Sequence, residues 1–469
     1  MKIVIIGGGI SGLTTAYYLQ KKIAAAGINA DVKVIEKEAV IGGKVKSILD
    51  KGALHEWGPN GFLDNKPLTL ELCEELGISD KLLVSNDSAR KRFIYSNGKL
   101  YRLAENPLKF FLSGLLSVTG RFRILAEPFI KKYAEKKDET LAAFARRRLG
   151  QEALDKLIAP MASGIFAGNP ETMSLKACFP RIHQLEQQYG SLIKAMRQIA
   201  KARKNEDEES APASATGPGG KLTSFVNGLQ TLTDSLASHI GKDNILNCEI
   251  SSLTKNQDGS YTLIDKENNK ISADIVISAL PAYSASQVFT DLDSNLANSL
   301  ARIKYAPLIV VCSSYEKTRV KHDLDGFGYL LARDETIPVL GTLWDSSIFP
   351  NRAPDGSILL RSMLGGARHP NLIKYTDEQI SLVVRESYET ILDIKFAPQT
   401  EKIYRHEQAI PEYGVGHCDL VNEIESSVAS HAGLFITGNA FHGVGINDCI
   451  NSADMTSENV VNYLKALSA

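Results

Sequence analysis

The first 36 residues change their hydrophobic period twice, as a βαβ unit does. The apolar run Lys2–Ile6 predicts a buried strand, a helical period follows from about Ser11 to Ala26, and Ala30–Glu36 predicts a second strand. Glycines fill the turn between the first strand and the helix. The pattern therefore predicts a Rossmann-like α/β sheet at the start of the chain.

The rest of the chain alternates between helical and strand patterns. A helix-rich stretch runs from about residue 107 to 203, and short alternating strands follow between residues 250 and 277. Residues 283–427 mix strands with helices, and the clearest of these helices is expected near Asp377–Leu392. The run Gly433–Gly438 predicts one more buried strand, which is followed by a glycine turn and a closing helix.

The breaks between these patterns predict the domains. Residues 205–219 are rich in acidic residues, Ser, Ala, Pro and Gly without an apolar period, which is typical of a flexible surface loop. We therefore expect a nucleotide-binding domain assembled from residues 1–85, 220–281 and 428–469. A helical insertion at 86–204 would line a substrate pocket, and a mixed-sheet substrate-binding domain would occupy 282–427.

Composition narrows the function classes. Because 53 Lys and Arg balance 54 Asp and Glu, the protein has no net positive charge that would attract nucleic acid, and we expect no nucleic-acid partner. Six scattered cysteines lack the spacing of a zinc or iron–sulfur site, so we expect no metal, free thiols and a cytoplasmic protein. The N-terminus runs directly into a strand without an export signal. A spanning helix needs about 20 apolar residues, and the most apolar stretch, Phe110–Val118, is much shorter.

A glycine fingerprint supplies the first candidate chemistry. In the motif Gly7-x-Gly9-x-x-Gly12, the first glycine makes a tight turn, the second admits a pyrophosphate, and the third lets helix and strand approach. Glu36 ends the next predicted strand, where an acid accepts hydrogen bonds from ribose hydroxyls. A second glycine pair and a cation follow in Gly42-Gly43-Lys44. This addition favours FAD over NAD.

Further motifs carry a resemblance over essentially the whole chain. They are Glu56-Trp57-Gly58-Pro59-Asn60, the stretch from Ser163 to Asn169, the stretch from Ser174 to Pro180, and the stretch from Gly438 to Ile450. Together with the fingerprint they resemble the porphyrinogen oxidase family of the flavin amine oxidase superfamily, and in particular its soluble bacterial type. The resemblance implies an FAD enzyme of haem biosynthesis. It would oxidise coproporphyrinogen III to coproporphyrin III by six electrons, with dioxygen as acceptor and hydrogen peroxide as by-product.

The fingerprint and the resemblance together give the expected site. The FAD-binding residues would be Gly7, Gly8, Gly9, Ile10, Ser11, Gly12, Glu36, Lys37, Gly42, Gly43, Lys44, Gly58, Pro59, Asn60, Gly61, Ile250, Gly438, Asn439, Val444, Gly445 and Ile446. By resemblance, the carbonyl of Gly164 would polarise pyrrole N–H groups, unless this glycine serves helix packing. Arg92 and Lys66 would bind propionates, with solvated surface cations as the alternative. His442 is left outside the catalytic set, since a lone histidine more often packs or hydrogen-bonds.

Several alternatives stay open at this stage. The substrate could be protoporphyrinogen IX, and a flavin amine oxidase or a flavin-binding regulator without turnover would share the fingerprint. Apolar residues between Leu103 and Phe129 predict either a pocket wall, which we favour, or a peripheral membrane contact. The resemblance also leaves open a transient contact with a ferrochelatase that would receive the product.

Overall fold

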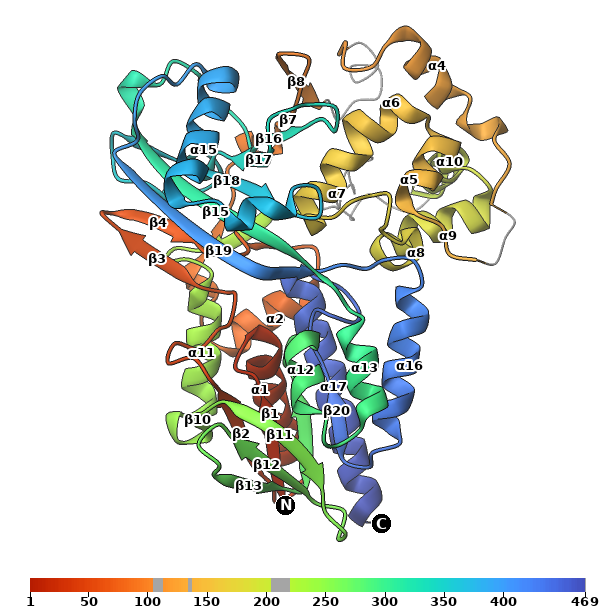
Figure 1. Ribbon diagram of the computed structural model, residues 1–469, viewed down its shortest axis with the longest axis vertical. Coiled ribbons are helices and arrows are strands. Elements are labelled where there is room, and N and C mark those ends of the chain that lie inside the picture. Colours follow the sequence, from red (N-terminus) through yellow and green to blue (C-terminus); the bar gives the residue numbers. More distant parts are fainter. Residues whose placement is uncertain (104–112, 134–136, 204–219, 469) are drawn as a thin grey trace.

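The protein has three lobes that meet near its centre (Figure 1). The computed structural model describes residues 1–103, 113–133, 137–203 and 220–468. A nucleotide lobe, at the bottom of Figure 1, holds both termini. Above it lie a sheet lobe built on a seven-stranded sheet and, beside that, a helical lobe formed by residues 118–133 and 137–203. The predicted loop at 205–219 lies outside the described residues.

The nucleotide lobe is built on a five-stranded parallel sheet that confirms the predicted Rossmann-like fold. Its strand order is β10-β2-β1-β14-β20. The strands come from distant parts of the chain: β1 (Lys2–Ile6), β2 (Asp31–Glu36), β10 (Ile245–Asn247), β14 (Ile275–Ser278) and β20 (Leu434–Ile436). All four pairings are parallel. The carboxyl ends of β1 and β2 therefore meet at one edge, where α/β folds bind their ligands.

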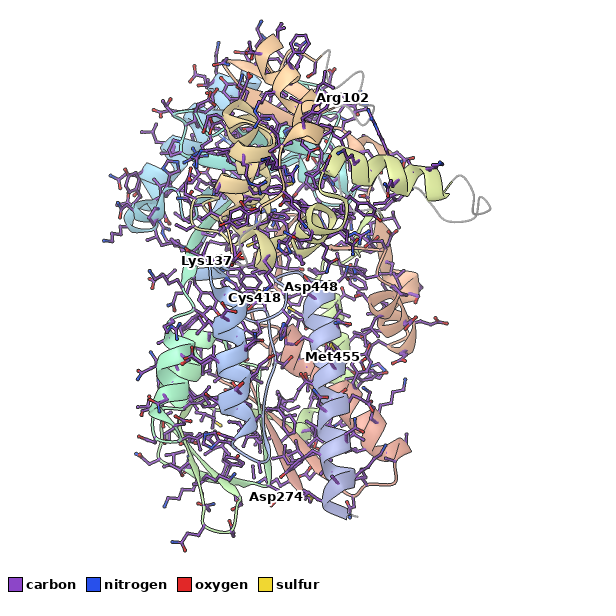
Figure 2. All side chains as sticks on the ribbon, turned by 90° about the vertical axis from the view of Figure 1, so that its right-hand side faces the viewer. Arg102, Lys137, Asp274, Cys418, Asp448 and Met455 are labelled. Atoms are coloured by element: carbon purple, nitrogen blue, oxygen red, sulfur yellow. The ribbon has the colours of Figure 1, made fainter. Side chains whose placement is uncertain are left out.

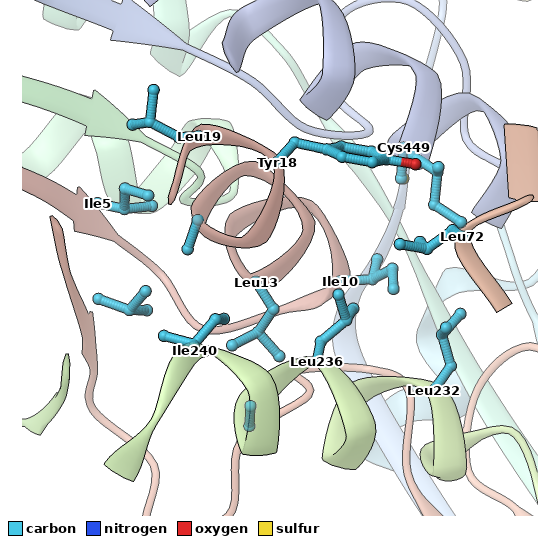
Figure 3. Packing of buried hydrophobic residues seen from close by; sticks show 14 of the residues in the cluster. Ile5, Ile10, Leu13, Tyr18, Leu19, Leu72, Leu232, Leu236, Ile240 and Cys449 are labelled. Carbon is cyan, nitrogen blue, oxygen red and sulfur yellow. The ribbon is translucent and has the colours of Figure 1, made fainter. Parts of the chain in front are cut away.

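Helix α1 (Ile10–Ala25) sits at the centre of the core of this lobe (Figure 3). It packs between α11 (Gln230–Ile240) and α17 (Ile446–Ser468). Leu13 and Leu236 are both completely buried, and Figure 3 shows them facing each other between α1 and α11. Burial of each such side chain contributes roughly 1.5–3 kcal/mol. This packing fixes the start of α1, and with it the glycine turn.

The sheet lobe carries the seven-stranded sheet in the order β19-β15-β18-β17-β16-β7-β8. Its strands are β15 (Tyr305–Glu316), β16 (Gly328–Leu331), β17 (Val339–Leu343), β18 (Ser357–Gly365), β19 (Thr400–Pro411), β7 (Arg92–Ser96) and β8 (Lys99–Leu103). Helix α15 occupies Asp377–Leu392, as predicted, and covers one face. The other face looks towards the nucleotide lobe.

The prediction of a helical segment from residue 86 was wrong at its start, because β7 and β8 form a hairpin at the edge of this sheet. Asn97 and Gly98 both have positive φ, at 51° and 74°. An Asn-Gly pair in this conformation makes the two-residue turn that suits the twist of a hairpin. The helical lobe begins only after the hairpin.

The remaining elements complete the lobes. The helical lobe contains α4 (Val118–Leu125), α5 (Leu141–Arg148), α6 (Gln151–Ala153), a π-helical turn (Leu154–Ile158), α7 (Ala159–Phe166), α8 (Leu175–Cys178), α9 (Pro180–Tyr189) and α10 (Leu192–Arg203). Antiparallel strands β11 (Ile250–Lys255), β12 (Tyr261–Asp265) and β13 (Lys270–Ala273) form a small sheet beside the nucleotide lobe. Further elements are β3 (Ser47–Asp50), β4 (Ala53–Glu56), β5 (Phe62–Leu63), α2 (Pro67–Glu75), β6 (Leu82–Val84), β9 (Leu222–Phe225), α12 (Ala282–Val288), α13 (Ser294–Ala301), α14 (Asp345–Ile348) and α16 (His417–Ala429). Over the described ranges, no helix is both long and apolar enough to cross a membrane.

Candidate functional site

A cavity of about 2520 Å³ lies where the three lobes meet. A site for one small ligand typically measures about 300–1,000 Å³, so this cavity has room for a large cofactor and a second ligand together. Most of the residues predicted for cofactor and substrate line it; Gly8, Gly12 and Lys66 are outside the lining. The fold therefore brings together glycines, an acid and apolar residues from segments more than 400 positions apart.

The glycine turn after β1 forms one end of the cavity. A Cβ on Gly12 would lie 1.9 Å from the carbonyl oxygen of Gly7, which explains why α1 can approach the strand so closely only with glycine there. A Cβ on Gly9 would meet nothing nearer than the Cα of Gly43 at 4.0 Å. The space above Gly9 thus opens into the cavity at the N-terminus of α1, where backbone N–H groups favour a phosphate.

Glu36 lies beside this turn at the end of β2 and is buried, with 9% of its surface exposed. Its Oε2 accepts a hydrogen bond from the Gly8 amide at 2.7 Å, and its Oε1 accepts one from the Glu38 amide at 2.9 Å. Each carboxylate oxygen has a second lone pair, so the side chain retains acceptors for ribose hydroxyls. Ile250, at the start of β11, lines the same end.

Lys44 ties the second glycine turn to the sheet lobe. Its Nζ donates to the carbonyl oxygen of Gln408 at 2.7 Å and to that of Ala409, and it lies 5.5 Å from the ring centroid of Tyr305. Burial lowers the pKa of Lys44 to about 8. An ammonium group carries three N–H donors, so one donor is left for a ligand in the cavity. A contact between Lys44 and a phosphate stays a prediction.

The N-terminus of α17 also forms part of the cavity wall. Val444, Gly445 and Ile446 line the cavity there, and the Asp448 carboxylate accepts a hydrogen bond from the Gly445 amide at 3.1 Å. Figure 2 shows Asp448 at the end of α17 that meets the upper lobes, with Met455 farther down the same helix. The partial positive charge of a helix N-terminus stabilises a negatively charged group near it.

Tyr413 holds the loop before α17, a role that no local sequence pattern indicates. Its hydroxyl donates to the carbonyl oxygen of Asn439 at 2.6 Å and accepts from the Gly443 amide at 2.9 Å. The ring stacks on His417 with centroids 4.0 Å apart. Burial lowers the pKa of His417 to about 4, so this imidazole is neutral near pH 7. Tyr413 also lines the cavity and links the helical lobe to the loop.

The residues predicted for the substrate lie in different surroundings. Gly164 lines the cavity in the last turn of α7, where carbonyl groups lack a donor within the helix. The Arg92 guanidinium lies 5.3 Å from the Phe327 ring centroid, and both residues line the cavity. Lys66 precedes α2 and is exposed. The binding roles of these three residues stay predictions.

The upper part of the cavity is mainly apolar. Met161 and Ile165 of α7 face it from the helical lobe, and Leu330 and Met363 face it from the sheet lobe. The lining histidines are engaged by other groups. His406 Nε2 lies 3.0 Å from the carbonyl oxygen of Trp57, and His442 Nε2 lies 2.6 Å from Glu425 Oε1. Such a site suits chemistry supplied by a cofactor better than chemistry that needs a strong protein base.

The apolar stretch from Leu103 to Phe129 is divided between cavity and surface. Leu103 lines the cavity, whereas Leu115 and Leu116 are buried outside its lining. Phe122 on α4 is 67% exposed, and Phe129 in the turn after α4 is 87% exposed, so the favoured pocket-wall interpretation was wrong for them. The packing of the helical lobe leaves both side chains facing outward. Phe110, Phe111 and Leu112 lie outside the described residues.

Comparison with known proteins agrees with the geometry. The family model described as flavin containing amine oxidoreductase matches residues 10–461. The chain belongs to this family. It is an FAD-dependent oxidoreductase, and the open space above Gly9, the acceptors of Glu36 and the α17 N-terminus fit that cofactor.

The relatives cover nearly the whole chain. The chain is 32% identical to the chloroplastic protoporphyrinogen oxidase of Oryza sativa subsp. japonica, over 98% of this chain and 88% of that protein. It is 28% identical to the coproporphyrinogen III oxidase of Bacillus subtilis, over 98% of both chains. A solved protein from Exiguobacterium sp. 255-15 has the same fold, with a TM-score of 0.82, 24% identity and 99% of both chains covered.

Proposed function

We propose that the protein oxidises coproporphyrinogen III to coproporphyrin III in haem biosynthesis. Three successive two-electron oxidations remove six hydrogen atoms, and each returns its electrons to dioxygen as one hydrogen peroxide. The observation that carries the proposal is the apolar compartment continuous with the FAD cradle, which matches a large tetrapyrrole macrocycle with an apolar ring system. The relatives named as porphyrinogen oxidases support it.

The bound FAD would accept the hydride, and the protein has three tasks around it. Met161, Ile165 and Leu330 hold the macrocycle and exclude water. The Gly164 carbonyl accepts a hydrogen bond from a pyrrole N–H, which orients the ring and polarises it. Arg92 meets a propionate at the rim, where a guanidinium can donate two hydrogen bonds to one carboxylate.

Two related substrates compete for this assignment. Protoporphyrinogen IX is the second candidate, because the chloroplastic relative is slightly more similar to this chain than the Bacillus protein is. The two porphyrinogens differ in the number of their carboxylates, four against two. Purified protein should therefore be tested with both in parallel, with porphyrin fluorescence, oxygen uptake and peroxide measured together.

The test has separable outcomes. Faster formation of coproporphyrin, with three peroxides for each porphyrin, supports the proposal. Preference for protoporphyrinogen replaces the substrate and keeps the reaction class. Turnover of cyclohexylamine without porphyrinogen oxidation would assign the chain to the amine oxidases, and FAD that neither substrate class reduces without oxygen would indicate a regulator.

A further inference from the structure

Arg361 is a buried charge whose neighbours on its face of β18 and on the two adjacent strands are apolar. Because side chains alternate along a strand, it shares its face of β18 with Leu359 and Met363. Its cross-strand neighbours are Cys312 on β15 and Leu343 on β17. Arg361 is only 2% exposed, yet it lines the cavity.

The guanidinium binds the segment that joins β4 to β5 in the nucleotide lobe. Its Nη1 donates to the carbonyl oxygens of Gly58 at 2.8 Å and Glu56 at 3.2 Å. Its Nε lies 3.2 Å from Oδ2 of Asp345. The other carboxylate oxygen of Asp345, Oδ1, accepts a hydrogen bond from the side-chain Nδ2 of Asn60 at 3.2 Å. One ion pair therefore fixes both ends of the segment Glu56–Asn60.

A contribution to folding stability does not by itself explain why the Arg361–Asp345 ion pair is buried. Asp345 is completely buried, and that burial raises its pKa although Arg361 opposes the shift. Buried ion pairs often contribute no more to stability than well-packed apolar residues of similar volume, because both charges lose their hydration. A buried charge at a cavity wall is instead typical of a functional site.

The position of the segment relates Arg361 to the cofactor. A Cβ on Gly58 would lie 2.3 Å from the carbonyl oxygen of Lys44, so the segment packs directly on the second glycine turn. Farther along, the Asn447 side chain of α17 donates to the carbonyl oxygen of Leu63 at 2.9 Å. The chain from Gly58 to Leu63 thus connects the second glycine turn with the N-terminal turn of α17. A flavin ring that extends from the pyrophosphate must pass along it.

We propose that Arg361, held by Asp345, is a positioning residue for the flavin. It fixes the Glu56–Asn60 segment against the ring, and its positive charge favours the reduced cofactor, which carries more negative charge than the oxidised one. The inference rests on the FAD placement used in the proposed function, but it does not depend on which substrate is oxidised.

The test compares three variants in FAD-loaded protein without any porphyrinogen. Arg361→Met removes the charge, Arg361→Lys keeps the charge without the planar fork, and Arg148→Met is the matched control. Arg148 is completely buried and paired with Glu127 and Glu186, but it lies outside the cavity lining. The readouts are the dissociation constant of oxidised FAD and the midpoint potential of the bound flavin.

We expect Arg361→Met to reduce the preference for reduced over oxidised FAD about tenfold, which is a fall of about 30 mV for a two-electron couple. Arg361→Lys should restore the potential but bind oxidised FAD more weakly than the parent, since one ammonium cannot replace the fork. Arg148→Met should leave the potential unchanged. An unchanged potential in Arg361→Met, or an equal fall in Arg148→Met, would overturn the inference.

A second variant keeps the test decisive if Arg361→Met fails to fold. Arg361→Met combined with Asp345→Asn leaves no unpaired buried charge and keeps an acceptor for Asn60. Arg361 lines the cavity and Asp345 does not, so the lost cation is the charge nearer the flavin. This pair should fold and show a fall in potential that is smaller than that of Arg361→Met, because a negative charge is removed as well, and a parental potential would refute the role. Because no porphyrinogen enters the measurement, failure of the substrate assignment is seen separately.

Discussion

Gly9 and Gly12 are only three positions apart, yet a methyl group added at each should have different consequences for the protein. At Gly9 the added Cβ points into the cavity, 4.0 Å from its nearest neighbour. At Gly12 it would lie 1.9 Å from the Gly7 carbonyl oxygen, which is backbone and cannot move aside. Gly9→Ala should therefore affect the ligand, and Gly12→Ala the fold.

The expected magnitudes follow from these distances. Gly9 has φ of −77°, a conformation that alanine also adopts. Losing chain freedom in the unfolded state stabilises such a variant by about 0.4–1 kcal/mol, while replacing glycine at a helix N-cap costs about as much. The apo protein should thus stay within about 1 kcal/mol of the parent. Gly12→Ala must separate α1 from β1, and overpacking of this kind costs about 1–3 kcal/mol or more.

The assay measures FAD binding and unfolding on the same samples. Apo protein is titrated with FAD, followed by flavin fluorescence, and the melting temperature is recorded without cofactor. Gly9→Ala should weaken FAD binding at least 100-fold, about 2.7 kcal/mol, with an unchanged melting temperature, and Gly9→Val should purify colourless. A yellow, FAD-replete Gly9→Val protein, or melting temperatures lowered equally in Gly9→Ala and Gly12→Ala, would refute this placement of the pyrophosphate.

Three further predictions concern the rim, the second glycine turn and the surface. Arg92→Ala should raise KM for coproporphyrinogen about tenfold, the cost of one charge-assisted contact, and leave FAD binding intact; Lys91→Ala, whose side chain pairs with Asp325, is the neighbouring control. The pKa of Lys44 is about 8 in the protein without cofactor. FAD affinity should therefore be constant below pH 8 and fall as the pH rises above 8, because the neutral amine no longer attracts a phosphate. FAD titrations of Lys44→Met should not show this dependence on pH. Phe122→Asp with Phe129→Asp should reduce sedimentation with anionic vesicles and leave turnover unchanged. The control Leu382→Asp, at a site 57% exposed on α15, should change neither sedimentation nor turnover.

The parts of the fold that depend on local pattern could be predicted from the sequence. The βαβ start, the glycine turn and the helix Asp377–Leu392 each follow from a period or a motif within a few residues. The hairpin of β7 and β8 carried an equally local signal in Asn97-Gly98, but the expectation of a helical segment overrode it. Phe122 and Phe129 show the limit of such reasoning, since an apolar residue predicts burial without saying which neighbour covers it.

Arg361 and Tyr413 could not be predicted, because their roles depend on partners far away in the sequence. Arg361 donates to a carbonyl group 303 positions away, and nothing near it in the chain indicates that partner. The only local sign of a role for Arg361 is an arginine among the mainly apolar residues of a strand, and this sign does not identify the partner. The lobes must be assembled before either side chain has a function.

In the hydrogen bonds that join the lobes around the cavity, a side chain of one segment donates to a backbone carbonyl of another, and this shared feature can be tested. Lys44 donates to the carbonyl of Ala409, Arg361 to that of Gly58, and Tyr413 to that of Asn439. Because every residue carries a backbone carbonyl, the identity of the receiving side chain is not constrained by the bond, whereas the donor is. Asn439→Ala should therefore keep the loop before α17 in place, while Tyr413→Phe removes a donor to one backbone group and an acceptor from another. If the melting temperature of the cofactor-free protein falls about equally in both variants, the side chain of Asn439 holds the loop and this account of how the lobes are joined is incorrect. If only Tyr413→Phe lowers it, the cavity is shaped by its donors.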